Sequence, residues 1–419
     1  MVEIIDKHLV DLSGIDIGYV NKCIPFMHRM CNSSIQFARA VAEKSLLDLQ
    51  APISSFGGFA LASLINSDRC AGFAMATKFL DADEVTLDLA VARGIQHSMH
   101  IIDDTLDPRA LALFEKLQLK SDEEVVIATI QILQFNRVIN FESKLSLARA
   151  FKFNGSSRIA DEVLQLFHDK YDFERLKTPD IRHFLAELLN INKLDGYWIE
   201  KFLSSASRHC PEETLTFFKE RVSNASSQRN WDLRPCNSGA YSHQRLLFDQ
   251  TDKTKLLLED VLLWMQSDDS ELFTYRAREL FEAMFVPFSP DVIRVFQTLV
   301  HDRNCEEVQF IAKLLSLDAK TVVFENVELV EDLFERLRRC GNINLKMIIG
   351  HFLIGANNGV KRAAFGQPYD EDLELKERSE QILERISRYS PAFDLYQDIL
   401  ENADLRIQDS IRRSEYLQE

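Results

Sequence analysis

The stretch Ser289–Leu317, SPDVIRVFQTLVHDRNCEEVQFIAKLLSL, decides the fold that we expect for this chain. Ser289 is a favourable helix N-cap, and Pro290 suits the first helical position, where its missing N–H costs nothing. Apolar residues at helical spacing follow at Val292, Phe296, Leu299 and Val300. After the polar run 301–304, a second set consists of Val308, Ile311, Ala312 and Leu315. Asn304 can cap this second helix, and the short connection predicts that the two amphipathic helices lie antiparallel.

The same pattern of capped amphipathic helices recurs along much of the chain. Neither helix of such a hairpin can bury its apolar stripe alone, so the hairpins are expected to stack on one another. Candidate helix starts recur about every 15–20 residues, as in helical repeats. They lie near Ser33, Pro52, Ser67, Asp83, Asp107, Ser121, Phe141, Ser156, Pro179 and Asp195. At Ser121, a Glu three residues later predicts a capping box. The units share pattern but little identity, and in this they resemble the HEAT and armadillo-like repeat proteins.

The composition agrees with a helical chain. Its 419 residues include only 14 Gly and 10 Pro, which leaves too few turn residues for an all-β fold. We therefore expect an all-α protein, and the resemblance implies an α-solenoid of antiparallel helical hairpins. A polar, turn-rich stretch interrupts the pattern and allows a hinge between two halves. The expected parts are an N-terminal repeat half (1–222), a central loop or hinge (223–252), a C-terminal repeat half (253–356), and capping helices with a charged tail (357–419).

The central loop, 223–252, concentrates basic and aromatic side chains in an otherwise acidic chain. A loop of this length within a compact domain is often functional or marks a boundary. One interpretation is a hinge between the two halves. The other is a partner-binding site made of Arg229, Trp231, Arg234, Tyr241, His243 and Arg245.

The stretch Gln96–Asp107, QHSMHIIDDTLD, contains the residues best suited to chemistry. A helix from Asp83 to about Ile102 would bring three of them to one face, because they are spaced at i, i+3 and i+7. These three are His97, His100 and Asp104. Imidazole and carboxylate groups are ligands of transition metals, so the stretch predicts a metal site.

The carboxylates of the same stretch carry a second resemblance. Asp103, Asp104 and Asp107 spell a DDxxD motif, which is similar to that of the isoprenoid synthases. The resemblance implies that Asp103 and Asp107 bind magnesium, which in turn binds a substrate diphosphate. The second metal motif of that family is absent. The structural alternative is that Pro108 ends the helix, so that the aspartates form a turn and a new N-cap.

Charge and cysteine usage limit the compartment and the partners. A net charge of −16 repels a phosphate backbone and fits a protein partner with a basic surface. The seven cysteines are scattered without a CxxC pair, which favours a reducing compartment with buried or neutral thiols. The acidic N-terminus does not resemble a signal peptide, and the most apolar stretch, 51–64, is too short to span a bilayer. We expect a cytoplasmic protein without membrane contact and without a cofactor.

These observations favour a non-enzymatic interaction protein. No P-loop, GxGxxG, GxSxG or HExxH motif occurs, whereas helical repeats supply long binding surfaces. We expect a protein–protein interaction scaffold or recognition module, which by analogy of fold could belong to a larger bacterial signalling or defence assembly. The alternatives are a metal-dependent enzyme using the 96–107 stretch, and a nucleic-acid-binding repeat protein using Arg229, Arg234 and Arg245.

Overall fold

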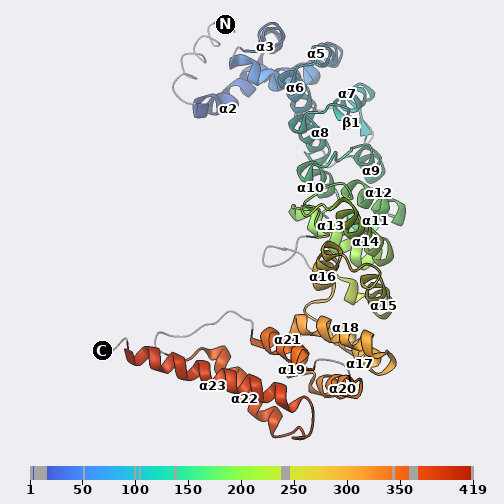
Figure 1. Ribbon diagram of the computed structural model, residues 1–419. Helices are drawn as coiled ribbons and strands as arrows, with labels where there is room; N and C mark the ends of the chain where they lie inside the picture. Colours follow the sequence, from blue (N-terminus) through green and yellow to red (C-terminus); the bar gives the residue numbers. More distant parts are fainter. Residues whose placement is uncertain are drawn as a thin grey trace. The chain divides into compact units, whose positions relative to one another are not determined.

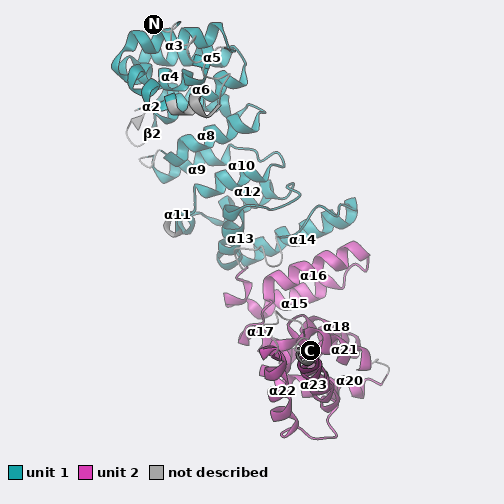
Figure 2. Ribbon diagram, turned by 90° about the vertical axis from the view of Figure 1, so that its left-hand side faces the viewer, with its two compact units in different colours: residues 1–244 teal, residues 245–419 magenta. Residues whose placement is uncertain are grey.

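The computed structural model describes residues 3, 17–50, 52–98, 101–102, 105–135, 139–236, 246–341, 345–357 and 367–416. This part of the chain is helical almost throughout, which confirms the expected all-α class (Figure 1). Within it, extended backbone pairs only in two short strands, β1 (Ile101–Ile102) and β2 (Thr105–Leu106), which are antiparallel. The chain forms two compact units, Met1–Gln244 and Arg245–Glu419, and each is described by itself (Figure 2).

Unit 1 is built from short helices joined by tight connections. They are α2 (Ile17–Ser33), α3 (Ile35–Leu47), η1 (Pro52–Phe56), α4 (Gly57–Ser67), α5 (Arg69–Asp81), α6 (Val85–Gln96), α7 (Pro108–Gln118), α8 (Glu123–Phe135), α9 (Phe141–Arg149), α10 (Ser157–Gln165), α11 (Lys170–Arg175), α12 (Thr178–Leu188), α13 (Tyr197–His209) and α14 (Pro211–Gln228). From α6 onward the packing is between near neighbours in sequence. Helix α6 contacts α8, α8 contacts α10 and α10 contacts α13, while α9 contacts α12 and α12 contacts α14. Figure 1 shows these as two adjacent rows of helices.

Phenylalanine rings link the successive hairpins of unit 1. Phe167 contacts Phe141 and Phe184, with ring centroids 6.1 and 5.4 Å apart, and Phe184 contacts Phe202 at 6.1 Å. All four rings are buried. Because each side chain of this size removes a large apolar area from water, these contacts stabilise one hairpin against the next.

Helices α4 and α6 approach each other unusually closely. A Cβ atom added to Gly94 would lie 2.8 Å from the Cβ of Leu61, and one added to Gly58 would lie 2.9 Å from the Cβ of Arg93. The helices can therefore cross at this distance only because both positions lack a side chain.

Among the described residues of unit 1, Arg221 is the largest fully buried polar side chain, and it binds backbone carbonyls. Its guanidinium donates to the carbonyl oxygens of Leu188 at 2.9 Å and Leu189 at 3.1 Å, where α12 ends. It also donates to Asn192 at 3.3 Å and, from Nε, to Arg234 at 3.0 Å. Burial lowers its pKa to about 10, which still leaves the side chain charged at neutral pH. Arg221 thus joins the end of α12 to the segment that follows α14.

Unit 2 contains a second series of helices. They are η2 (Phe248–Gln250), α15 (Thr254–Met265), α16 (Glu271–Phe285), α17 (Pro290–Asp302), α18 (Cys305–Leu315), η3 (Ser316–Asp318), α19 (Ala319–Glu325), α20 (Val327–Arg339), α21 (Leu345–Asn357), α22 (Asp370–Leu383) and α23 (Phe393–Tyr416). Helix α17 contacts α15, α18 and α20, and α21 contacts α19, α20 and α23. The final two helices, α22 and α23, pack on each other.

The hairpin predicted at 289–317 forms as α17 and α18, with the expected caps. Ser289 Oγ accepts a hydrogen bond from the backbone N–H of Val292 at 3.4 Å. Asn304 and Glu307 form a reciprocal capping box, with distances of 3.0 and 3.2 Å. The local sequence therefore sets both helix starts, as predicted.

A disulfide bond between Cys305 and Cys340 corrects the expectation of unpaired thiols. It joins the first residue of α18 to the C-cap of α20, 35 residues later, while the five other cysteines are free. The two sulfur atoms meet because α18 and α20 pack together, and this packing between hairpins is not evident from the spacing of the cysteines.

The boundary between the units, after residue 244, falls inside the stretch 223–252. The first residues of that stretch continue α14 to Gln228 and so do not form a loop. None of the helices in the described ranges is both long and apolar enough to cross a membrane.

Candidate functional site

The predicted metal-binding helix does not extend far enough to form the site. Helix α6 ends at Gln96 and His97 is its C-cap, whereas 101–102 and 105–106 are strands. The expectation that His97, His100 and Asp104 share one helical face is therefore wrong. Of the five predicted ligands, His100, Asp103 and Asp104 lie outside the described residues.

His97 has an aromatic environment. Its ring stacks on Phe59, with centroids 5.7 Å apart and an angle of 27° between the planes, and Phe59 also contacts His28 at 5.3 Å. Burial lowers the pKa of His97, and the nearby His28 and Arg93 lower it further. The lowered pKa favours the neutral imidazole, and His97, although exposed, packs one ring face against Phe59.

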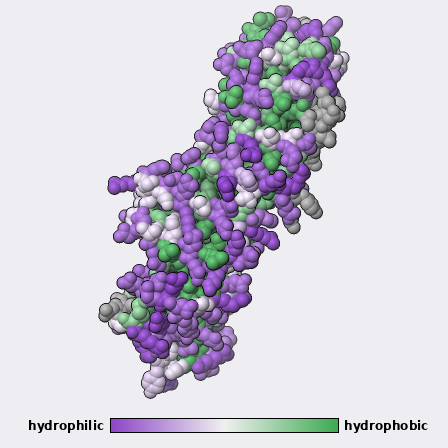
Figure 3. All heavy atoms as spheres, turned by 90° about the vertical axis from the view of Figure 1, so that its right-hand side faces the viewer, coloured by the Kyte–Doolittle hydropathy of each residue, from purple (hydrophilic) through white to green (hydrophobic). Residues whose placement is uncertain are grey.

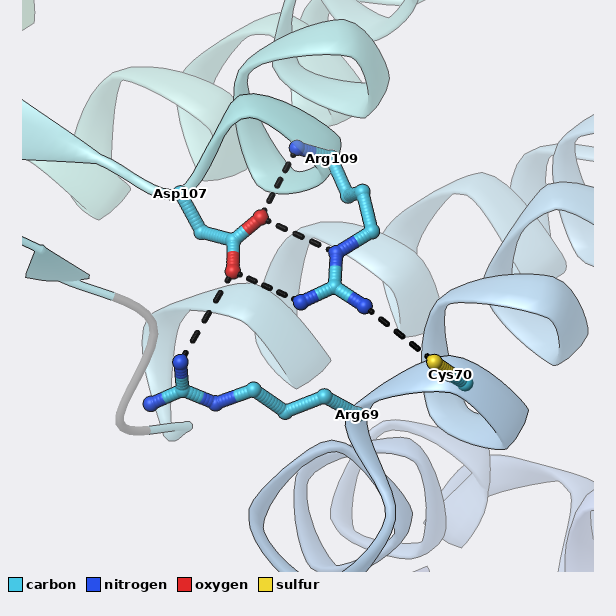
Figure 4. Close-up of polar contacts among 4 residues, drawn as sticks. All are labelled: Arg69, Cys70, Asp107 and Arg109. Atoms are coloured by element: carbon cyan, nitrogen blue, oxygen red, sulfur yellow. Dashed lines mark hydrogen bonds and ion pairs between the residues drawn. The ribbon is translucent and has the colours of Figure 1, made fainter.

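Asp107 lies among arginine side chains (Figure 4). It is the N-cap of α7, and its Oδ1 accepts from the backbone N–H of Arg109 at 2.9 Å and from Arg109 Nε at 3.1 Å. Its Oδ2 accepts from Arg109 Nη2 at 3.0 Å, and Arg69 Nη1 lies 3.8 Å away. The Arg109 guanidinium also donates to Cys70 Sγ at 3.6 Å.

This arrangement assigns Asp107 a structural role. Its side chain is 1% exposed, and the hydrogen bond from the Arg109 side chain is the main reason that its pKa is lowered. A cation would have to displace guanidinium groups that already satisfy both carboxylate oxygens. Of the structural alternative, the new N-cap before Pro108 is thus confirmed for Asp107. Within the described ranges, no three His, Cys, Asp or Glu residues are placed to hold a metal ion together.

Three of the predicted partner-binding residues lie on the short segment after α14. Arg229 is the left-handed C-cap of that helix, with φ of 51°, and Trp231 is 51% exposed. The Arg234 side chain is exposed as well, while its N–H donates to the Asn192 carbonyl at 3.1 Å. The structure therefore presents Arg229, Trp231 and Arg234 at the surface of unit 1. Tyr241, His243 and Arg245 lie outside the described residues.

The surface drawn in Figure 3 is mostly hydrophilic, with hydrophobic side chains in small separate patches. Concave hollows that are mostly apolar and carry a few polar groups are the usual sites where ligands and anchoring side chains bind. The described part of each unit contains a hollow whose walls combine apolar side chains with a few charged groups.

The hollow in unit 1, here called the aromatic pocket, has a volume of about 140 Å³. Its walls come from α10, α11, α13 and the turn after α10. They consist of Leu164, Phe167, His168, Phe173, Glu174, Trp198, Lys201, Phe202, Ser205 and His209. The Trp198 ring lies 5.1 Å from the His168 ring and 5.1 Å from Lys201 Nζ, and Phe173 contacts Phe202 at 5.7 Å. Buried phenylalanines thus form the floor, while polar side chains lie at the rim.

The hollow in unit 2, here called the acidic groove, has a volume of about 370 Å³. Its walls are α15 and α18, with the end of α17 between them. They consist of Glu259, Asp260, Leu262, Leu263, Gln266, Leu299, Arg303, Glu307, Phe310 and Ile311. Arg303 Nη1 lies 3.4 Å from Glu307 Oε1, so the one arginine of the groove is paired within it.

Neither hollow was predicted from the sequence. For the acidic groove, the sequence does contain a signal, in the segment 255–265, KLLLEDVLLWM. This segment is apolar on more than one helical face, so some of its leucines must lie outside the core. The residues that line the aromatic pocket belong to several helices, and no local sequence pattern indicates the pocket.

Comparisons of this chain with protein-family models, with curated proteins and with solved structures find no match.

Proposed function

We propose that this chain is a cytoplasmic, non-enzymatic protein that binds other proteins through a HEAT- or armadillo-like α-solenoid. The hairpin α17–α18 and the near-neighbour packing in unit 1 support the solenoid interpretation. Stacked hairpins of this kind expose extended surfaces on which peptide segments can bind. The exposed Arg229, Trp231 and Arg234 of unit 1 supply further side chains for such contacts.

The aromatic pocket is the observation that carries the proposal. Its volume of about 140 Å³ matches one aromatic ring, because a dry cavity of about 150 Å³ binds benzene. The floor is apolar, so an aromatic side chain gains the free energy of leaving water there. His168, Lys201 and His209 at the rim can hydrogen-bond to the flanking peptide backbone. Such a pocket is typical of the anchor residues that dominate protein interfaces.

The enzyme alternative has less support. Asp107 is already bound by Arg109, and α6 ends before the other predicted ligands. The net charge of −16 likewise counts against nucleic acid as the main partner.

Selection from a random peptide library on the whole chain tests the proposal. We expect the enriched peptides to share one aromatic residue. Ser205, which is half-buried in the pocket wall, provides the matched variants. Ser205→Phe would fill the pocket and abolish binding, whereas Ser205→Ala would leave it intact. Enriched peptides that bind Ser205→Phe as tightly as the parent chain, or no enrichment at all, would contradict the proposal.

A further inference from the structure

We infer that the acidic groove binds a basic amphipathic helix of a partner protein, with leucine-sized or aromatic anchors on one helical face. The inference rests on the proposed protein-binding function and specifies a partner for unit 2.

One face of α15 presents apolar and acidic side chains together. Leu256, Glu259, Asp260 and Leu263 are spaced at i, i+3, i+4 and i+7, so they lie along one side of the helix. The two leucines are 66% and 72% exposed. Exposing a leucine side chain to water is unfavourable, and covering it with a partner would be favourable. Their Cα atoms are about 10.5 Å apart along the helix axis, at 1.5 Å per residue. A docked helix with anchors two turns apart has the same spacing.

The groove beside this face has an apolar floor. Leu262, Leu299 and Ile311 are each less than 10% exposed, while Phe310 is half-buried in the opposite wall. A side chain that enters between α15 and α18 would therefore contact hydrocarbon on both sides. This geometry fits the apolar stripe of an amphipathic helix.

The charges of the groove select a basic partner. Carboxylates of Glu259, Asp260 and Glu307 line the groove, and the guanidinium that lines it, from Arg303, is paired with Glu307. The segment after α15 adds Asp268 and Asp269, both exposed. The C-terminal end of α15 itself carries partial negative charge. Lysine and arginine on the rim of a docked helix would thus be attracted, and an acidic helix would be repelled.

The wall formed by α18 is held in place before any partner arrives. Arg336 donates to the carbonyl of Arg303 at 3.2 Å, and the disulfide from Cys305 to Cys340, under conditions in which it is formed, also fixes the first residue of α18. The capping box of Asn304 and Glu307 holds the same turn. A preformed groove binds more tightly because less conformational entropy is lost on binding.

The test uses the whole chain and a labelled synthetic helix of leucine and lysine, with leucines at i, i+3, i+4 and i+7. Fluorescence anisotropy should show binding that weakens as salt rises. A scrambled peptide of the same composition and a leucine–glutamate helix should bind at least tenfold more weakly. Leu263→Asp and Glu259→Lys should each weaken binding of the leucine–lysine helix about tenfold or more.

Two exposed positions elsewhere in unit 2 provide matched controls. Glu384→Lys makes the same change in charge as Glu259→Lys, and Tyr389→Asp introduces the same aspartate as Leu263→Asp at a 91% exposed position. Both should bind like the parent chain. Equal loss in Glu384→Lys and Glu259→Lys would mean unspecific attraction to an acidic protein and would overturn the inference. Sedimentation that shows a dimer dissociated by Leu263→Asp would overturn it too, because a second copy would then occupy the groove.

The inference and the proposed function can fail separately. If the leucine–lysine helix does not bind while peptides selected on the aromatic pocket do, only the inference about the acidic groove is wrong. If neither the leucine–lysine helix nor any library peptide binds, the proposed protein-binding function is wrong as well.

Discussion

Arg221→Met should destabilise the region around the end of α12. The methionine keeps the apolar part of the side chain but removes donors from the carbonyls of Leu188, Leu189, Asn192 and Arg234. A buried acceptor left without a partner costs about 1–3 kcal/mol. The Leu188 carbonyl interaction is fully buried and the others are partly buried, so water can replace some of the lost bonds. Because burial of the cation itself is also unfavourable, we expect a net loss of about 3 kcal/mol.

Hydrogen exchange measured by mass spectrometry would locate this loss. Peptides that cover 185–236 should exchange faster in Arg221→Met, by roughly two orders of magnitude at 1.4 kcal/mol per factor of ten. Arg221→Lys keeps the charge but not the fork of donors, so its effect should be intermediate. Arg229→Met removes an exposed arginine eight residues later and should change little. Exchange in Arg221→Met within threefold of the parent chain would refute the role assigned to this side chain.

Three further predictions follow from the packing. Gly94→Ala should lower the free energy of unfolding, measured by thermal unfolding, by about 1–3 kcal/mol, because the new Cβ meets Leu61. Gly350→Ala has open space around its Cβ and should be neutral or stabilising. Equal effects of the two substitutions would contradict the close crossing of α4 and α6. Asp107→Ala should cost about 1–2 kcal/mol as a lost N-cap, and Asp107→Asn less because Asn also caps. The pKa of Asp107 is lowered in the folded chain, so its carboxylate stabilises the fold fully above the unfolded pKa of about 3.9. The free energies of unfolding of Asp107→Asn and the parent chain should therefore converge as the pH falls through the lower folded pKa. A constant difference in free energy of unfolding down to about pH 2 would argue against the ion pair. Cys305→Ser should lower the free energy of unfolding of unit 2 by about 3–4 kcal/mol, as expected for a disulfide that closes a loop of this length. A reductant should make the parent chain as unstable as the variant. Equal free energies of unfolding under oxidising conditions would exclude the disulfide.

Features that depend on neighbouring residues could be predicted from the sequence. The hairpin α17–α18 has its caps at Ser289 and Asn304, because each caps donors only three residues ahead. The N-cap predicted at Ser121 lies one residue later, since Asp122 Oδ1 accepts from the backbone N–H of Val125. Both residue types cap well, and spacing alone does not distinguish two adjacent candidates.

The end of α6 shows why a single helix from Asp83 to about Ile102 was wrongly predicted. Between Gln96 and Pro108 no proline or glycine stops the helical pattern, and Ile101 and Ile102 are compatible with a helix or a strand. The helix nevertheless ends at Gln96, and Ile101 pairs with Leu106. A segment of ambiguous local preference is decided by its packing.

Features that join separate helices could not be predicted. Cys305 and Cys340 are 35 residues apart, and Arg221 reaches carbonyls about 30 residues before it in the chain. The walls of the aromatic pocket and of the acidic groove likewise come from helices that only the folded chain brings together. The sequence supplies the stripes and caps, while the hollows between hairpins depend on how the helices pack.

Photo-crosslinking in living cells tests the central claim of protein binding most directly. A benzophenone amino acid would replace Trp198 at the aromatic pocket or, separately, Leu263 at the acidic groove, with Leu119 and Tyr389 as exposed control positions. We predict that mass spectrometry identifies a defined protein crosslinked at Trp198 and lost when Ser205→Phe is added, with no such product from the control positions. Products that are the same at all four positions, or no protein product at Trp198 and Leu263, would contradict the claim.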